Sequence, residues 1–393
     1  MTVSVLIEEL AALQVDLTLE GNQLRVNAPR GVLTPELKER IREQRDLVVE
    51  LLSSAARPTP KFEPIKPHSP EQPAPLTSAQ HQLWFLDQLD PGGSFLNVPM
   101  TLRIVGGLDI DALSWVVTEL GRRHDVLCSE IIVQDDEPHQ LVDGIGLRLE
   151  FEDYSHLEEI ERERTISARR DEELARPFDF GRREPLARFF LFRAAKNEHL
   201  LVIVAEHVIF DGPSQDILLD ELKALYEARI AGQPMPPGPK VRFADFSRWQ
   251  RQMFEGKSHA ADLDYWKQRL SGMPVQLELP TDHPRPRQAT HLGNRAHRWL
   301  DPALVNRLRR VARAHGATLN MLALASIQLL LSRYSGQSDF GVGVPLQGRN
   351  RPECEKLIGM FVSTLVLRSE IPAAGSFSDL LLRVRDSQIE ALS

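Results

Sequence analysis

The chain of 393 residues has little of several features that would assign it to a class at once. Its two cysteines, Cys128 and Cys354, are too few for a disulfide framework and fit a reducing cytoplasm. Basic residues are not in excess, because the net charge is -8, which argues against nucleic acid as the main partner. No apolar run approaches membrane-spanning length, and the N-terminus "MTVSVLIEELAAL" lacks the basic region of a signal peptide. We therefore expect a cytoplasmic protein that binds neither membranes nor nucleic acid.

The histidines also lack the spacing of metal ligands, so no metal site is predicted. This holds for His81, His124, His199 and His283. Hydrophobic residues make up 42% of the chain and charged residues 26%, which is the composition of a globular protein. The length suffices for two or three domains, each with its own core.

Proline is concentrated in one segment of the chain. The stretch "RPTPKFEPIKPHSPEQPAPL", residues 57–76, has neither helical nor strand periodicity. Such a composition is typical of an extended, semi-rigid and solvated linker. We therefore divide the chain into a small domain at residues 1–56, a linker at 57–75 and a large domain at 76–393.

The small domain has the pattern helix, hairpin, helix. Apolar residues of "VLIEELAAL" recur at helical spacing, and "LTPEL" has a helix cap at Thr34 followed by Pro35. Between them, apolar and polar residues alternate on both sides of Gly21-Asn22, which predicts a tight β-hairpin. A hairpin has free edges that can accept a partner strand, so the predicted docking edge comprises Val15, Leu17, Leu19, Leu24 and Val26. The alternative is a folding cap on the large domain, but a long proline-rich tether favours binding.

The stretch "LIEELAALQVDLTLEGNQLRVNAPRGVLTPELKERI" resembles the tubulysin-type N-terminal docking domain of nonribosomal peptide synthetases. The resemblance covers nearly all of residues 3–53 and implies an α-β-β-α docking domain. It also implies that the hairpin edge receives a C-terminal tail of the upstream synthetase, and that the domain can form a homodimer.

The large domain alternates helical and strand patterns, which predicts an α/β (α+β) fold. Strand-like runs include "MTLRIVG", "ARFFLFRA" and "HLLVIVAEHVIFDG", and "SQDILLDELKALYEARIAG" is an amphipathic helix. Strands are also predicted in "EIIVQ", "HQLVD", "DFGVGVPLQGR" and "FVSTLVLRSEI". The remaining helices are predicted in "SAQHQLWFLDQL", in "IDALSWVVTELGRRHDVL" and, as a pair, in residues 302–336.

The stretch "VIVAEHVIFDG" places an ionisable pair at the end of an apolar strand. Neighbours in a strand point to opposite faces, so Glu206 and His207 cannot share a site. We expect Asp211 to cap the next helix, and Gly212 to permit a close backbone approach or an unusual dihedral angle. In the functional interpretation, neutral His207 accepts a proton from an attacking amine, and Asp211 holds the loop through a salt bridge. The alternative is a hydrogen-bonded core histidine and a plain helix cap.

Five motifs occur in order: "TSAQHQLWFL", "RRHDVLCSEI", "EHVIFDG", "FADFSRWQR" and "IGMFVSTLVLR". They resemble successive motifs of nonribosomal peptide synthetase condensation domains, and "PLQGR" also resembles that family. The resemblance implies a two-lobed fold like that of chloramphenicol acetyltransferase, with an N-lobe at about 76–250 and a partial C-lobe at about 251–393. It implies His207, Asp211 and Gly212 as catalytic residues. Motif residues in supporting roles would be Glu206, Ser78, Gln80, Trp84, Arg123, His124, Ser363 and Arg368.

The resemblance also implies the reaction. An acyl group on an upstream carrier protein would be attacked by the amine of an aminoacyl thioester on a downstream carrier protein. Both substrates would arrive on phosphopantetheine arms at a tunnel between the lobes, and the chain itself would bind no cofactor.

Three positions depart from the family pattern. Glu206 stands where the family usually has the first of two histidines, so this buried carboxyl needs a donor partner or a raised pKa. Arg188 and Arg193 are candidate partners. Cys128 stands where the family has an arginine. If that arginine pairs with the motif aspartate in the family, Asp211 needs another arginine as its partner. Ser363 replaces an asparagine, which is a mild change.

The last stretch, "SFSDLLLRVRDSQIEALS", is an amphipathic helix, whereas the family continues for roughly a hundred residues. We therefore expect a piece of a longer synthetase. Two alternatives to a condensation enzyme remain open. One is a docking and scaffolding module without catalysis, and the other is an acyltransferase that uses a coenzyme A thioester. The docking domain argues against the second alternative, since a free donor needs no docked protein.

Overall fold

The computed structural model describes residues 16–20, 23–27, 64–69, 72–89, 92–142, 146–180, 184–255, 259–284, 286, 293, 296–372 and 374–392. The helices expected on either side of the N-terminal hairpin, Val15 and the Gly21-Asn22 turn lie outside the described residues. The chain divides into two compact units. One comprises residues 1–64, 299–324 and 377–385, and the other comprises 65–298, 325–376 and 386–393.

The first unit contains the predicted hairpin. Strands β1 (Asp16–Glu20) and β2 (Gln23–Asn27) are antiparallel. Their register pairs Leu17 with Val26 and Leu19 with Leu24, so the alternation in the sequence is confirmed as a β-ribbon. The same unit contains α10 (Pro302–Ala314), which begins after its cap residue Asp301.

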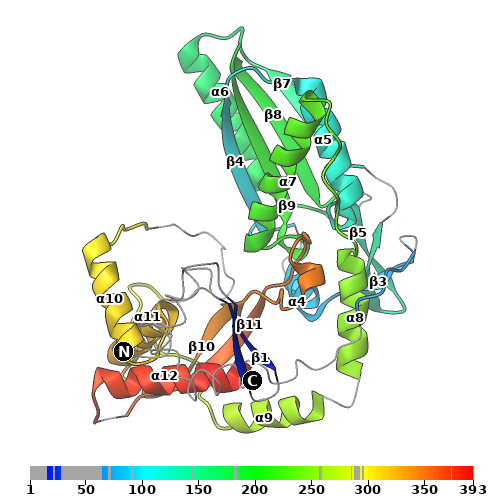
Figure 1. Ribbon diagram of the computed structural model, residues 1–393. Coiled ribbons are helices and arrows are strands. Elements are labelled where there is room, and N and C mark those ends of the chain that lie inside the picture. The colour runs from blue at the N-terminus through cyan, green and yellow to red at the C-terminus, as the bar shows by residue number, and fades with distance from the viewer. Residues whose placement is uncertain are drawn as a thin grey trace. The chain divides into compact units, whose positions relative to one another are not determined.

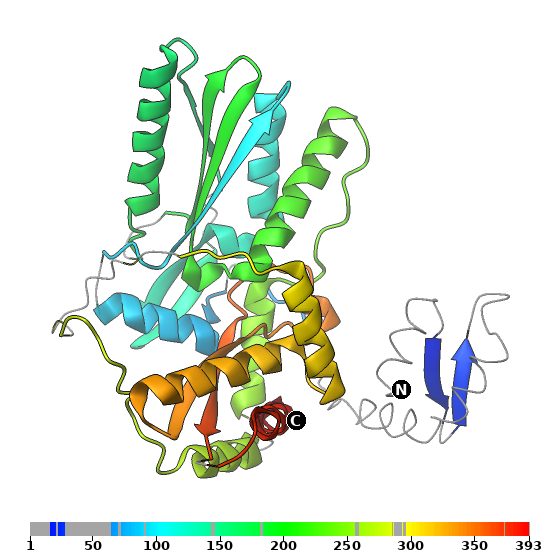
Figure 2. The same cartoon turned by 90° about the vertical axis from the view of Figure 1, so that its left-hand side faces the viewer.

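The main sheet of the second unit has the strand order β4-β9-β8-β7. Strand β4 (Asn97–Val105) pairs antiparallel with β9 (Glu198–Glu206), and β9 with β8 (Ala187–Ala195). Strand β7 (Leu149–Asp153) is parallel to β8 and is joined to it through α6 (Glu159–Ala175). Helix α6 lies on one face of the sheet, and α5 (Ile110–Arg123) and α7 (Gly212–Ile230) lie on the other, as Figures 1 and 2 show.

Helices on both faces explain why the two central strands have continuous buried runs that are mostly apolar. In β8 the run from Ala187 to Phe192 is buried at every position, and in β9 so is the run from Leu201 to Glu206. Phe189, Phe190 and Phe192 are among the largest fully buried side chains. The strand that carries the Glu206-His207 pair therefore crosses the centre of the core.

A second sheet has the order β3-β6-β5. Strands β5 (Ser129–Gln134) and β6 (Glu137–Val142) form the predicted hairpin, with Asp135 and Asp136 at positive φ in its turn. The third strand, β3 (Ala74–Pro75), comes from the proline-rich segment and pairs with β6.

The second half of that segment differs from the solvated linker that its composition predicts. Ile65 is 5% exposed and belongs to the hydrophobic core, and Ala74 is buried. The physical reason is that the extended backbone leaves carbonyls free as acceptors, and the large domain supplies donors for several of them.

The remaining elements complete a mixed fold. Further helices are α4 (Ser78–Leu89), α8 (Phe243–Glu255), α9 (Ala260–Leu270), α11 (Leu319–Ser335) and α12 (Phe377–Leu392). Strands β10 (Asp339–Leu346) and β11 (Ser363–Glu370) form a two-stranded antiparallel sheet. The predicted α+β class is confirmed. The sequence analysis did not identify β7, α6 or α9. Within the described ranges, no single helix is long and apolar enough to cross a membrane, and only α10 and α11 taken together, with a break between them, reach that threshold.

Candidate functional site

The predicted catalytic histidine lies where β9 ends. After Glu206 the chain enters a short 3-10 turn, η2 (His207–Ile209), and the backbone N–H of His207 donates to the carbonyl of Leu96 at 2.9 Å. The ring is half-buried, and its Nδ1 is buried without a hydrogen-bond partner among the described residues. No carboxylate of that part of the chain bonds to this nitrogen, so His207 is not the middle member of a Ser-His-Asp arrangement there.

Glu206 is the last residue of β9 and is buried. Its side chain is 3% exposed, and its carboxylate accepts a hydrogen bond from the backbone N–H of Val208, which caps the η2 turn. Burial raises the pKa of Glu206 to about 8, against a smaller opposing effect of the Val208 bond. The carboxyl group is therefore largely protonated at neutral pH.

Neither arginine proposed as a partner for Glu206 forms that pair. Arg188 donates to the carbonyl of Arg176 and lies over the ring of Phe178, and Arg193 forms an ion pair with Asp153. The prediction of a raised pKa is confirmed, and the prediction of an arginine partner is wrong. In the register of β8 and β9, Arg188 lies opposite Val204 and Arg193 lies opposite His199, so neither arginine is the direct neighbour of Glu206.

Asp211 is held by a ring of donors. As the cap of α7 it accepts from the backbone N–H of Ser214 at 3.0 Å and from the Ser214 hydroxyl at 2.6 Å. The backbone N–H of Phe361 donates to its second oxygen at 3.1 Å. Arg349 contacts both oxygens, at 2.7 and 2.9 Å. The predicted cap and the predicted salt bridge are both present, and every oxygen of this buried carboxylate is engaged.

Arg349 is a site residue that the sequence analysis did not name. Because it pairs with Asp211, a cysteine at position 128 does not leave Asp211 without a cation. The signal was the "PLQGR" stretch, in which Gly348 has φ +66° and a side chain would collide with the carbonyl of Phe361. Only glycine fits this turn, and the turn aims Arg349 at Asp211.

The fifth motif reaches the site through its first residues. Gly359 exchanges two hydrogen bonds with the Ser214 hydroxyl, at 3.1 Å each, and packs so closely on Phe243 that a Cβ would enter its ring. Phe361 supplies the backbone donor to Asp211. Ser363, the motif residue predicted from the sequence, is exposed at the start of β11.

Gly212 shows neither the close backbone approach nor the unusual dihedral angle that the sequence predicted for it. Its φ is not in the left-handed region, and a Cβ would meet nothing within 4 Å. It occupies the first position of α7, directly after Asp211. Neither a close approach of this chain nor an unusual dihedral angle explains glycine here; the residue leaves open space beside the Asp211 loop.

The first-motif residues lie on α4, which packs against the η2 turn. Gln80 is buried and caps its own helix by exchanging hydrogen bonds with Thr77, and its amide donates to Gln140 at 3.3 Å. The backbone N–H of Ser78 donates to Gln250. Trp84 packs on the core, so it supports the turn from behind.

Arg123 and His124 belong to a separate polar group at the end of α5. Arg123 contacts Glu119, Glu221 and the carbonyl of Pro236. Burial, followed by the charge of Arg123, lowers the pKa of His124 to about 4, so this histidine is neutral at pH 7. Its Nε2 lies 3.9 Å from Glu221, which is too long for a hydrogen bond. These two residues brace α5 against α7.

Arg368 is also removed from the Asp211 ring of donors. It pairs with Asp339 at 2.7 Å and donates to the carbonyls of Arg269 and Ser271. It therefore joins β11 to β10 and to the end of α9. The structure thus brings His207, Asp211 and Arg349 to one place and leaves the second-motif residues and Arg368 as supports elsewhere.

The arrangement defines what chemistry the site can perform. Asp211 is not available as a base, because an arginine and three other donors occupy both of its oxygens. The imidazole of His207 remains as the group at the turn with a ring nitrogen that no described residue engages. In the part of the chain that the structure describes, no three His, Cys, Asp or Glu residues are grouped as metal ligands.

Comparison with known proteins identifies similar chains. Residues 70–393 match the family model of the condensation domain, and residues 3–54 match that of the TubC N-terminal docking domain. One of the linear gramicidin synthase subunits from Brevibacillus parabrevis is 41% identical over 327 residues, which are 83% of this chain and 6% of that protein. The chain therefore spans only a small part of this curated relative.

Solved structures share the fold. The first condensation domain of the CDA synthetase is similar with a TM-score of 0.64 and 24% identity, over 82% of this chain and 76% of that one. The cyclization-docking bidomain of a nonribosomal peptide synthetase from Sorangium cellulosum has a TM-score of 0.71 and 22% identity, over 100% of this chain and 78% of that one. The predicted condensation-type fold is confirmed.

Proposed function

The chain belongs to the condensation-domain family of nonribosomal peptide synthetases and carries a TubC-type docking domain at its N-terminus. From that premise we propose that it forms an amide bond between two carrier-bound thioesters, with His207 as the proton-transferring group. The observation that carries the proposal is the half-buried imidazole at the end of β9, beside an Asp211 loop held by Arg349.

The proposed step needs little covalent chemistry from the protein. The amine nitrogen of the acceptor attacks the thioester carbon of the donor, the carbon–sulfur bond breaks, and the proton leaves nitrogen and ends on sulfur. Alignment of two tethered reactants supplies about 7–11 kcal/mol of the barrier reduction. A histidine that receives and returns the proton adds about 10²–10⁴-fold. Asp211, Arg349 and Ser214 position the loop and take no part in proton transfer.

The substrates in this proposal arrive on the phosphopantetheine arms of donor and acceptor carrier proteins, and the chain binds no cofactor of its own. The open space beside Gly212 supports the passage of such an arm next to the loop. The free edges of the β1-β2 ribbon support recruitment of a C-terminal tail from the upstream synthetase by strand addition. We also propose that the docking domain can form a homodimer.

The test is product formation from the intact protein mixed with a loaded donor carrier and a loaded acceptor carrier. We expect a dipeptidyl product, and a loss of about 10²–10⁴ in rate for His207→Ala. His156→Ala, an exposed histidine, serves as the matched control and should retain the full rate.

Two results would support the alternative of a non-catalytic docking and scaffolding module, which Glu206 in place of a histidine favours. One is absence of product while a peptide with the last residues of the upstream synthetase still binds. The other is an unchanged rate in His207→Ala. Product from a coenzyme A thioester at the same rate as from the carrier would support the free acyltransferase.

A further inference from the structure

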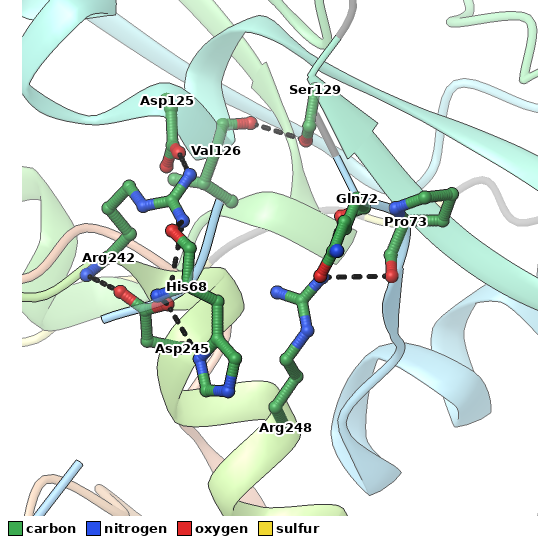
Figure 3. A network of polar contacts seen from close by, with 9 residues as sticks. All are labelled: His68, Gln72, Pro73, Asp125, Val126, Ser129, Arg242, Asp245 and Arg248. Carbon is green, nitrogen blue, oxygen red and sulfur yellow. Dashed lines mark hydrogen bonds and ion pairs between the residues drawn. The ribbon is translucent and has the colours of Figure 1, made fainter. Parts of the chain in front are cut away.

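Part of the proline-rich segment is bound to the second unit along its length. We call residues 65–69 and 72–75 the strap. Ile65 is in the core, and the backbone N–H of His68 donates to Asp245 at 2.8 Å, with the His68 ring at 3.3 Å from the same oxygen. Arg242 donates to the carbonyl of His68 and pairs with Asp125 at 3.0 Å (Figure 3).

One helix makes most of these contacts. On α8, Asp245 is fully buried and receives the two donors of His68, and the Ser247 hydroxyl donates to the carbonyl of Pro75. Arg248 donates to the carbonyls of Gln72 and Pro73, at 2.6 and 2.9 Å, as Figure 3 shows. Gln72 and Pro73 lie outside helices and strands, so Arg248 satisfies carbonyls that have no partner in secondary structure.

The same helix also contacts residues 359–361, which bond to the catalytic loop at residues 207–214. Phe243 and Phe246 pack on the ring of Phe361, with centroids 5.0 and 4.7 Å apart. Phe243 also fills the space above Gly359. Gly359 bonds to Ser214 and Phe361 donates to Asp211, so the segment that α8 presses on supplies donors to the loop next to His207.

We propose that the strap positions the catalytic loop through α8, so that the segment tethering the docking domain is also a working part of the condensation site. The strap sets the position of α8, α8 sets the position of residues 359–361, and these hold Asp211. Asp245, Ser247 and Arg248 are positioning residues. The expected effect of the strap on the reaction rate rests on the proposed function. The connection from the strap through α8 to residues 359–361 rests on the contacts alone.

The test compares two arginines on one helix in the intact protein. Arg248→Met removes both bonds to the strap and keeps the apolar stem, while Arg251→Met, whose arginine pairs with Glu137 and Glu255, is the matched control. We expect backbone hydrogen exchange in Arg248→Met to rise about tenfold in residues 65–75 and severalfold in residues 357–363, the scale of losing one or two hydrogen bonds. The kcat for product should fall about three- to tenfold, with KM for both carriers and binding of the upstream tail peptide unchanged. Arg251→Met should match the wild type in all readouts.

A milder variant guards against loss of folding. Ser247→Ala removes only the hydroxyl that donates to Pro75, and it should show the same pattern at a smaller size. The proposal is overturned if exchange rises in residues 65–75 while residues 357–363 and kcat do not change, because the strap is then only a cover. If the wild type forms no product, the proposed function fails, and the exchange data still decide the link between strap and loop.

Discussion

Two buried carboxylates, Glu206 and Asp211, lie on either side of the η2 turn and are treated differently by the fold. Asp211 meets an arginine at both oxygens, a hydroxyl and two backbone N–H groups. Glu206 receives one backbone N–H, and burial raises its pKa to about 8. The comparison shows that burial alone does not decide the charge of a carboxyl group; the number and charge of its donors does.

The different numbers of donors to Asp211 and Glu206 give the two carboxyl groups different structural roles. Asp211 ties together α7, the Gly348 turn and the start of the fifth motif through several simultaneous acceptor bonds. A protonated Glu206 adds no negative charge next to His207.

The largest expected effect on stability and rate comes from removing the arginine that pairs with Asp211, which leaves Asp211 without a cationic partner, as Glu206 is. Arg349→Met leaves a buried carboxylate without its cation, so we expect a loss of about 3–5 kcal/mol in the free energy of unfolding and no product. Arg351→Met, on the same loop and paired with the half-buried Glu353, should cost less than about 1 kcal/mol. Urea unfolding of both variants measures this; equal losses would show that the Asp211 pair has no special importance.

The next effect concerns the turn that aims Arg349. Gly348→Ala combines a left-handed φ with a collision against the carbonyl of Phe361, so we expect a loss above about 2 kcal/mol and a large fall in rate. Gly232→Ala is the control, because Gly232 has φ +61° but open space around it and reports the cost of the dihedral angle alone. Thermal unfolding of both variants separates the two contributions. If their losses are the same, the collision is relieved by a small shift.

The pH dependence of stability gives a third test. The raised pKa of Glu206 means that its contribution is fully present below about pH 4.5 and is lost as the pH rises toward about 8. Glu206→Gln keeps an acceptor for Val208 and cannot ionise, so we expect the decline between those values to be reduced and the protein to be more stable at pH 8. Glu152→Gln, in a half-buried position of β7, is the control. A Glu206→Gln profile with the same slope as the wild type over this range would contradict a protonated Glu206.

His124 should act in the opposite direction and over a neighbouring range. Its lowered pKa means that its contribution is present above about pH 6.5 and is lost as the pH falls toward about 4. We expect His124→Gln to flatten the acid side of the stability profile and leave the range near pH 8 unchanged. Unfolding curves from pH 4 to 9 measure both slopes; a profile identical to that of the wild type would mean that His124 is charged in the fold.

The smallest effect is expected at the position where the family has an arginine. Cys128 is buried against Gly121 and Leu147, and burial raises the pKa of its thiol to about 11, so it acts as an apolar residue. Cys128→Ala should cost about 1 kcal/mol and leave the rate within twofold, because Arg349 holds Asp211. A tenfold fall in rate would show that position 128 still supports the site.

The sequence predicted most of the helices and strands in which apolar residues recur at a regular spacing. The hairpin at residues 16–27, the strands that end at Glu206 and the helix that begins at Gly212 follow from alternation, helical spacing and the Asp211 cap. Strand β7 was not predicted, because its partner β8 lies some forty residues away and no local period marks it. The sequence analysis interpreted the strap as a solvated linker. Its proline-rich composition indicates a stiff, extended backbone, but composition does not show which donors of the large domain bond to the carbonyls of that backbone.

The sequence by itself determined the class of fold, the family motifs and the position of His207 at the end of a strand, since these depend on neighbours along the chain. Only the tertiary structure decided that Arg349 pairs with Asp211, that neither Arg188 nor Arg193 pairs with Glu206 and that the strap is bound to α8. Those outcomes depend on which groups meet across long separations in the chain, where charge and hydrogen bonding act through space and leave no periodicity to read.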